Sequence, residues 1–150
     1  MTDAGAKGLA ALESLTALDP TLKNVTAASL KELAALKNLI ALNLSGTRVT
    51  DAEMKELAAL RNLRILYLFG STNLTDDGVK QLATLKNLTI LDLTVTSVSD
   101  TGLMELSAIP GLAHLCVAGI HVSDAGVKEF RQRNPKCDLS VPSWSEAIKR

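Results

Sequence analysis

The chain has 150 residues, of which 47% are apolar, and its 16 basic and 16 acidic side chains leave no net charge. This composition indicates one soluble globular domain without a membrane span, and it does not favour nucleic acid or a membrane as a partner. The first residues, Met1 to Gly5, do not resemble a secretory signal. We therefore expect a cytoplasmic protein, although secretion by a non-classical route stays open.

The sequence repeats itself at a step of 24 residues. One step, from Thr50 to Thr75, is 25 residues long, and the extra residue falls in 69–74, which predicts a loop insertion. A fixed period of this length is the signature of a repeat architecture. The dipeptides that fall in register are Thr2-Asp3, Thr26-Ala27, Thr50-Asp51, Thr75-Asp76, Ser99-Asp100 and Ser123-Asp124.

Each repeat begins with a short alternating apolar pattern that predicts a half-buried strand. The expected inward pairs, in chain order, are Leu18 with Pro20, Leu42 with Leu44, Leu66 with Leu68, Leu91 with Leu93, Leu115 with Val117, and Leu139 with Val141. Six strands are therefore expected, and the proline in the first suits a sheet edge.

The second half of each repeat predicts a helix. Met54, Leu57 and Leu60 share one helical face, and Thr50 with Glu53 forms a capping box. The asparagines that follow three of the helices, Asn38, Asn62 and Asn87, are expected in the left-handed conformation that ends a helix. A strand and a helix in every repeat predict a parallel sheet with helices on its outer side, an α/β solenoid of about six repeats.

Residues 88–103, from Leu88-Thr89-Ile90-Leu91-Asp92-Leu93 to Asp100-Thr101-Gly102-Leu103, resemble the leucine-rich repeat pattern L-x-x-L-x-L-x-x-T-x-V-[ST]-D-x-G-L. The threonine form is similar to bacterial repeats of the ribonuclease-inhibitor-like or GALA kind. The resemblance implies a curved solenoid with the parallel sheet on its inner, concave face and the helices on its convex face. Thr47 and Thr96 stand where the family's asparagine ladder would be, and we expect their hydroxyls to bond the turn backbone.

The two ends of the array differ. We assign 1–142 to the solenoid and 143–150 to a C-terminal cap segment of the same domain. Ser143 and Glu146 predict a capping box, and Trp144 and Ile148 are expected to form a lid over the carboxyl end of the solenoid, with Trp144 as a binding anchor in the alternative. No separate cap precedes the first repeat, which could cap itself, belong to a longer array or pair with a second copy.

The resemblance implies that the inner face of the sheet binds the partner. On the central strand, Ile65, Tyr67 and Phe69 are expected to face water together, with Ile90 beside Ile65. The same face carries Asp19, Asp92 and Asp138 and, in these columns, no lysine or arginine, which favours a basic or apolar protein partner. The predicted partner-binding residues are Ile65, Tyr67, Phe69, Ile90, Asp92, His114 and Asn43.

His114 and Cys116 share a strand face with Asp92 and Asp138 on the flanking strands, a set that could form a nucleophile, a base and its orienter, or ligate zinc. Side chains two apart on a strand start about 6 to 7 Å from each other, and an open sheet face excludes no water, so we expect no catalysis, metal or cofactor. Cys116 and Cys137 are expected as free thiols.

The sequence therefore predicts a non-enzymatic protein–protein interaction module. The alternatives are a structural or self-associating scaffold that pairs through its amino end, and a recognition fragment of a larger effector or adaptor protein.

Overall fold

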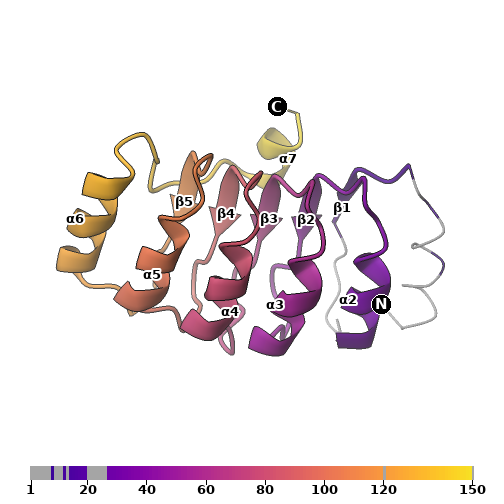
Figure 1. The fold of residues 1–150 in the computed structure, drawn as a ribbon, viewed down its shortest axis with the longest axis horizontal. Helices are drawn as coiled ribbons and strands as arrows, with labels where there is room; N and C mark the ends of the chain where they lie inside the picture. Colours follow the sequence, from indigo (N-terminus) through magenta and orange to yellow (C-terminus); the bar gives the residue numbers. More distant parts are fainter. Residues whose placement is uncertain (1–7, 9–11, 13, 20–26, 120, 150) are drawn as a thin grey trace.

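The computed structural model describes residues 8, 12, 14–19, 27–119 and 121–149. Five short strands form one parallel sheet in chain order, β1 (Ala17–Leu18), β2 (Ala41–Asn43), β3 (Ile65–Tyr67), β4 (Ile90–Asp92) and β5 (His114–Cys116). The helices are α2 (Ala27–Leu33), α3 (Asp51–Leu57), α4 (Asp76–Leu82), α5 (Asp100–Leu106), α6 (Asp124–Arg133) and α7 (Trp144–Ala147). Figure 1 shows α2 to α6 side by side along one face of the sheet, which confirms the predicted strand-and-helix repeat.

The main core lies between the sheet and this row of helices. Its inward strand residues, such as Leu42, Leu66 and Leu91, pack with the apolar helix faces that include Met54 and Leu103, and all of them are fully buried. Equivalent residues pair across the strands, with Leu42 opposite Leu66 and Leu66 opposite Leu91. The 24-residue step thus stacks each leucine on its own copy in the next repeat.

In α3, α4 and α5, an aspartate at the start of the helix links one repeat to the next. Asp76 accepts a hydrogen bond from the Ser99 backbone N–H (2.8 Å) and one from the Ser99 hydroxyl (2.5 Å). Asp51 bonds Thr75 in the same way, and Asp100 bonds Ser123. Each carboxylate therefore accepts both hydrogen bonds from the N-cap residue of the next helix and links the two neighbouring helices.

A glycine makes room for each of these aspartates. A β-carbon at Gly102 would overlap the Asp76 carboxylate, and Gly78 and Gly126 face the aspartates of their preceding repeats in the same way. In α3 the equivalent position is Glu53, and the sequence has Ala27 where the preceding aspartate would stand. Glu53 instead accepts the Thr50 N–H (2.8 Å), which confirms the predicted capping box.

The turns after the strands also repeat. As predicted, the hydroxyls of Thr47 and Thr96 donate to the carbonyls of Leu44 (2.6 Å) and Leu93 (2.8 Å). Gly46, Gly70 and Gly119 adopt positive φ in these turns. Val95 stands at the equivalent place with φ 56°, a conformation that strains a β-branched residue.

Two sequence predictions about the repeats are wrong. The sixth strand is reduced to one bridge between His114 and Asp138, because the chain turns away before Pro142, which cannot donate to a ladder. The asparagines after the helices do not take the left-handed conformation, since Val95 alone among the described non-glycine residues has positive φ. Asn62 and Asn87 instead donate to the carbonyls of Lys37 and Arg61 in the preceding repeat, each at 2.8 Å.

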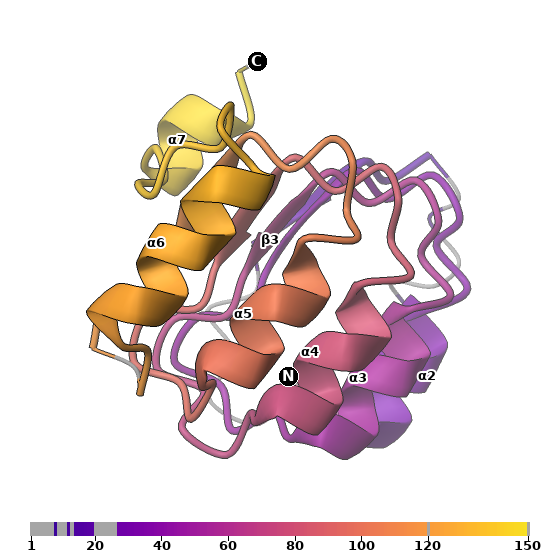
Figure 2. The same cartoon turned by 60° about the vertical axis from the view of Figure 1, so that its left-hand side comes forward.

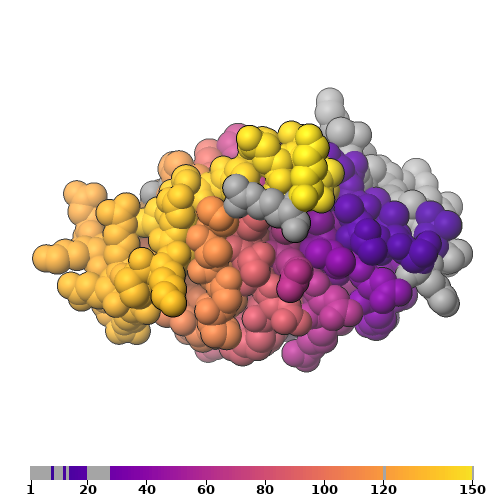
Figure 3. Space-filling view, turned by 90° about the horizontal axis from the view of Figure 1, so that it is seen from above, coloured from indigo at the N-terminus to yellow at the C-terminus, as the bar shows by residue number. Residues whose placement is uncertain are grey.

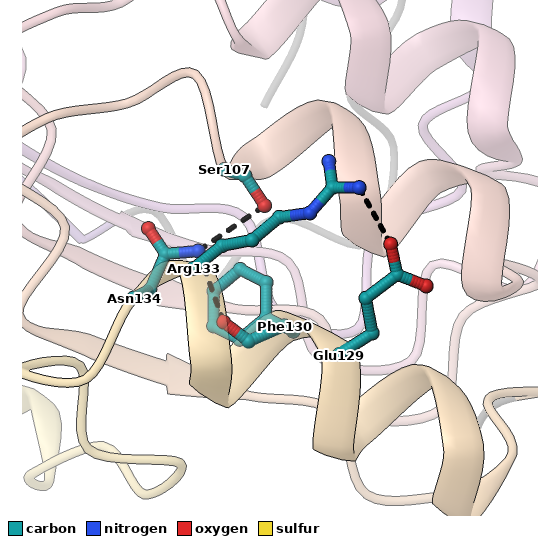
Figure 4. A network of polar contacts seen from close by, with 5 residues as sticks. All are labelled: Ser107, Glu129, Phe130, Arg133 and Asn134. Atoms are coloured by element: carbon teal, nitrogen blue, oxygen red, sulfur yellow. Dashed lines mark hydrogen bonds and ion pairs between the residues drawn. The ribbon is translucent and has the colours of Figure 1, made fainter.

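The last helix of the row, α6, is longer than the others and closes the carboxyl end of the core. Figure 4 shows the ring of Phe130 beside α6, to which the residue belongs, and the side chain is fully buried. The Asn134 amide donates to the hydroxyl of Ser107, the C-cap of α5 (3.1 Å), and Arg133 pairs with Glu129 one turn earlier (2.5 Å). Phe130 therefore supplies the apolar end of the core, while polar side chains of α6 face solvent.

Beyond α6 the chain crosses to the opposite face of the sheet. Figure 2 shows α7 standing apart from the layer formed by α2 to α6, and in Figure 3 the yellow C-terminal segment lies over the middle repeats. We call residues 141–149 the tail. The predicted Ser143–Glu146 capping box is present at the start of α7. The predicted positions of Trp144 and Ile148 are wrong, because the tail covers the sheet rather than the end of the solenoid.

Candidate functional site

The inner face of the sheet, which points away from α2 to α6, carries two columns of side chains in the predicted register. One column runs through Ala17, Ala41, Ile65, Ile90 and His114, and the other through Asn43, Tyr67, Asp92 and Cys116. Alternation along each strand places these columns opposite the leucines of the main core. The sequence therefore predicted correctly which residues share the inner face.

Four of these side chains form a contiguous apolar surface, which we call the inner patch: Ala41, Ile65, Tyr67 and Ile90. The prediction that Ile65, Tyr67 and Ile90 face water is wrong, because they are only 7%, 6% and 4% exposed. The tail covers them: Ala147 is fully buried against the inner patch, and Val141 and Trp144 pack around it. The patch and the tail form a second apolar cluster, separate from the main core.

Tyr67 is the main anchor for the tail. Its ring meets the ring of Trp144 edge to face, with the ring centres 5.6 Å apart and the planes at 89°. Its hydroxyl donates to the carbonyl of Pro142. An edge-to-face aromatic pair and a bonded phenol are typical of aromatic anchors at protein interfaces. Here both contacts are made within one chain.

The other predicted site residues are arranged differently. Phe69 lies outside the covered cluster and is 47% exposed. Asn43 and Asp92 each bond the backbone two residues ahead, the Asn43 Oδ1 accepting from the Ser45 N–H (3.0 Å) and the Asp92 Oδ1 from the Thr94 N–H (2.8 Å). Asp92 is also buried, so one of the three acidic residues that favoured a basic partner serves a turn instead, whereas Asp19 and Asp138 are exposed.

An open groove remains beside the tail, with a volume of about 480 Å³. Ile40, Ala41 and Ile65 line it from the sheet, Ile148 lines it from the tail, and Arg64 is among the polar lining residues. His114, a predicted site residue, lines it as well and is half-buried. The sequence analysis missed Ile40 and Arg64, because both lie before the strands and outside the alternating columns.

The two cysteines have different surroundings. The half-buried Cys116 sulfur accepts a hydrogen bond from the Thr94 hydroxyl (3.1 Å). Burial, and then the nearby charge of Asp138, raise the pKa of the Cys137 thiol to about 11. His114 meets Asp138 through the backbone bridge. Among the described residues, no group of three or more histidine, cysteine or acidic side chains could hold a metal ion, and no helix is long and apolar enough to cross a membrane.

The sequence and the fold were compared with those of known proteins. A family model of the leucine-rich repeat matches residues 84–107. An internalin from Listeria monocytogenes superposes with a TM-score of 0.70 at 19% identity, over 90% of this chain and 36% of that chain. A leucine-rich repeat protein from Leptospira interrogans superposes with a TM-score of 0.65 at 21% identity, over 89% of this chain and 38% of that chain. No curated protein sequence matches the chain.

The parallel sheet, the outer row of helices and these likenesses define an α/β solenoid. Residues 84–107 match the leucine-rich repeat, and the described fold is that of a leucine-rich repeat solenoid. The chain spans well under half the length of either solved structure, so these structures support its fold and give no evidence on its partner.

Proposed function

We propose that the chain is a non-enzymatic module that binds a protein partner on the inner face of its sheet. The observation that carries the proposal is the inner patch. Its aromatic and aliphatic side chains belong to a cluster separate from the main core, so the stacking of the repeats does not account for them. The tail covers most of this surface, and the parts of the same face that meet solvent are Phe69 and the groove beside the tail.

The accessible parts of the same face support the proposal. Phe69 is exposed, and the groove beside the tail is lined largely by apolar side chains such as Ile40 and Ile65. Exposed aromatic residues and concave apolar surfaces dominate binding in many interfaces. Because Asp92 is buried and bonded within its turn, the middle of this face offers a partner apolar side chains, and the exposed acidic residues of the face are Asp19 and Asp138.

Affinity capture from native lysate tests the proposal. The wild-type chain is compared with Phe69→Glu, which places a carboxylate on the inner face, and with Lys80→Glu, which places a carboxylate on the exposed side of α4. Both positions are exposed, so the melting temperature is expected to stay within about 2 °C. A partner retained by the wild type and by Lys80→Glu, and lost by Phe69→Glu, supports inner-face binding. Loss with Lys80→Glu alone would place the interaction on the helices instead.

A further inference from the structure

The tail already occupies the inner face as a folded ligand would. Trp144 and Ala147 lie three residues apart on α7, so both point to one side of the helix, and that side meets the inner patch. Trp144 packs on Tyr67, and Ala147 is fully buried against the patch. Laying one apolar face of a short helix on an apolar surface is a recurring mode of peptide recognition.

The tail can leave without opening the main core. The cluster it forms with the inner patch shares no residue with the main core, which continues from Leu30 to Cys137. Helix α7 has four residues, Ile148 is 46% exposed, and Trp144 is only half-buried. Weakly held elements of this kind open locally at a lower free energy than the global unfolding.

We propose that the tail is a built-in competitor that holds the inner face closed. The partner that displaces it carries a short helix with an aromatic and a small residue three positions apart. This inference rests on the proposed function, because it names the kind of partner and the regulation of the same face. Removal of the tail from the patch would leave Ala41, Ile65, Tyr67 and Ile90 open to such a helix.

The tethered arrangement sets the affinity to expect. A segment joined to its site by a short flexible linker has an effective concentration at that site of the order of 1 mM. If the tail is closed in about nine of ten molecules, the same segment added as a free peptide binds the open face with a Kd of about 0.1 mM. The closed tail then weakens the apparent binding of that peptide about tenfold.

The experiment uses the full chain and a peptide with the sequence of residues 140–149. Ala147→Glu releases the tail by placing a carboxylate at its fully buried contact, and every residue of the inner patch stays in place. Trp144 is the one tryptophan of the chain, so acrylamide quenching of its fluorescence reports the release directly. Peptide binding is followed through the methyl signals of Ile65 and Ile90.

We expect stronger quenching in Ala147→Glu than in the wild type, and about tenfold tighter peptide binding. The peptide that carries the same Ala147→Glu change should not bind. If Ala147→Glu does not fold, a second variant, Trp144→Ala, also releases the tail. The chain then has no tryptophan of its own, so the fluorescence comes from the added peptide alone. Equal peptide affinity for wild type and released chain, or no binding to a chain whose tail has left, would overturn the proposal.

The design separates this inference from the proposed function, because the peptide titration needs no natural partner. If the tail belonged to a neighbouring copy, light scattering would show a dimer and the intramolecular account would fail. If the peptide does not bind but Phe69→Glu still abolishes capture, the inner face is a binding site and the tail is not its competitor.

Discussion

The contact between Asp76 and Gly102 can be tested with Gly102→Ala. Helix preference and crowding of Asp76 predict opposite changes in stability for this substitution. Glycine inside a helix is normally less stable than alanine by about 1 kcal/mol, so Gly102→Ala would stabilise the protein on helix preference alone. The structure predicts the opposite. A methyl group at residue 102 would overlap the Asp76 carboxylate and lie 2.8 Å from a methyl group of Val98.

The size of the effect follows from these contacts. Overpacking of this kind costs about 1 to 3 kcal/mol, and displacing Asp76 weakens two hydrogen bonds to Ser99 that contribute about 1 kcal/mol each. Subtracting the helix preference leaves a net loss of about 2 kcal/mol. For a chain of this length the melting temperature should fall by about 4 to 8 °C, which urea and thermal unfolding both measure.

A double-mutant cycle tests the cause. In an Asp76→Ala background the carboxylate is gone, so Gly102→Ala should become neutral or stabilising. Thr101→Ala, at the adjacent exposed position of α5, is the matched control and should change stability by less than about 0.5 kcal/mol. A stabilising effect of Gly102→Ala in the wild type, or an equal cost in both backgrounds, would refute the aspartate–glycine link.

Three further predictions concern single residues. Val95→Gly should stabilise the protein by about 1 kcal/mol, because glycine adopts the positive φ of this turn without strain, and chemical unfolding measures the gain. Iodoacetamide should label Cys116 well before Cys137 at pH 8, because the raised pKa of Cys137 lowers its thiolate fraction about a hundredfold. The Ser123 hydroxyl, then its backbone N–H, lower the pKa of Asp100, so Ser123→Ala should raise that pKa, as followed by a carboxyl titration in NMR.

Each of these three predictions has a result that would contradict it. Loss of stability in Val95→Gly would show that the valine side chain does more than occupy the turn. Equal labelling of the two cysteines in the folded chain would contradict the burial of Cys137. For Asp100, a lowered pKa gives stability that is present above the unfolded pKa and lost as pH falls through the folded pKa. An unchanged Asp100 pKa in Ser123→Ala would rule out the hydroxyl as its main cause.

The repeat explains how much of the fold could be predicted. Because each segment has copies at a fixed step, the alignment of Leu42, Leu66 and Leu91 predicted both the register and the face of every described strand. The aspartate–glycine link was visible in the same alignment as the recurring Asp-x-Gly. Its meaning was missed, because the aspartate of one repeat contacts the glycine of the next.

The tail could not be placed in this way. Residues 142–149 have no copy elsewhere in the chain, so no register argument applies to them, and the capping box at Ser143 predicted the start of α7 without its position. The alternation of the strands predicts that Ile65, Tyr67 and Ile90 share one face of the sheet. The sequence could not show that the chain itself covers them, because that contact joins residues about 75 positions apart, as in the bond from Tyr67 to Pro142. The predicted pairing through the amino end falls on 1–7, outside the described residues.

Site-specific photo-cross-linking tests inner-face binding most directly. A photoreactive phenylalanine analogue replaces Phe69, which is exposed on the inner side, and in a second chain it replaces Lys80 on the outer helices. After irradiation in native lysate, we expect a protein adduct from position 69 and none from position 80. An adduct from position 80 with none from position 69 would contradict the account and place the partner on the helices.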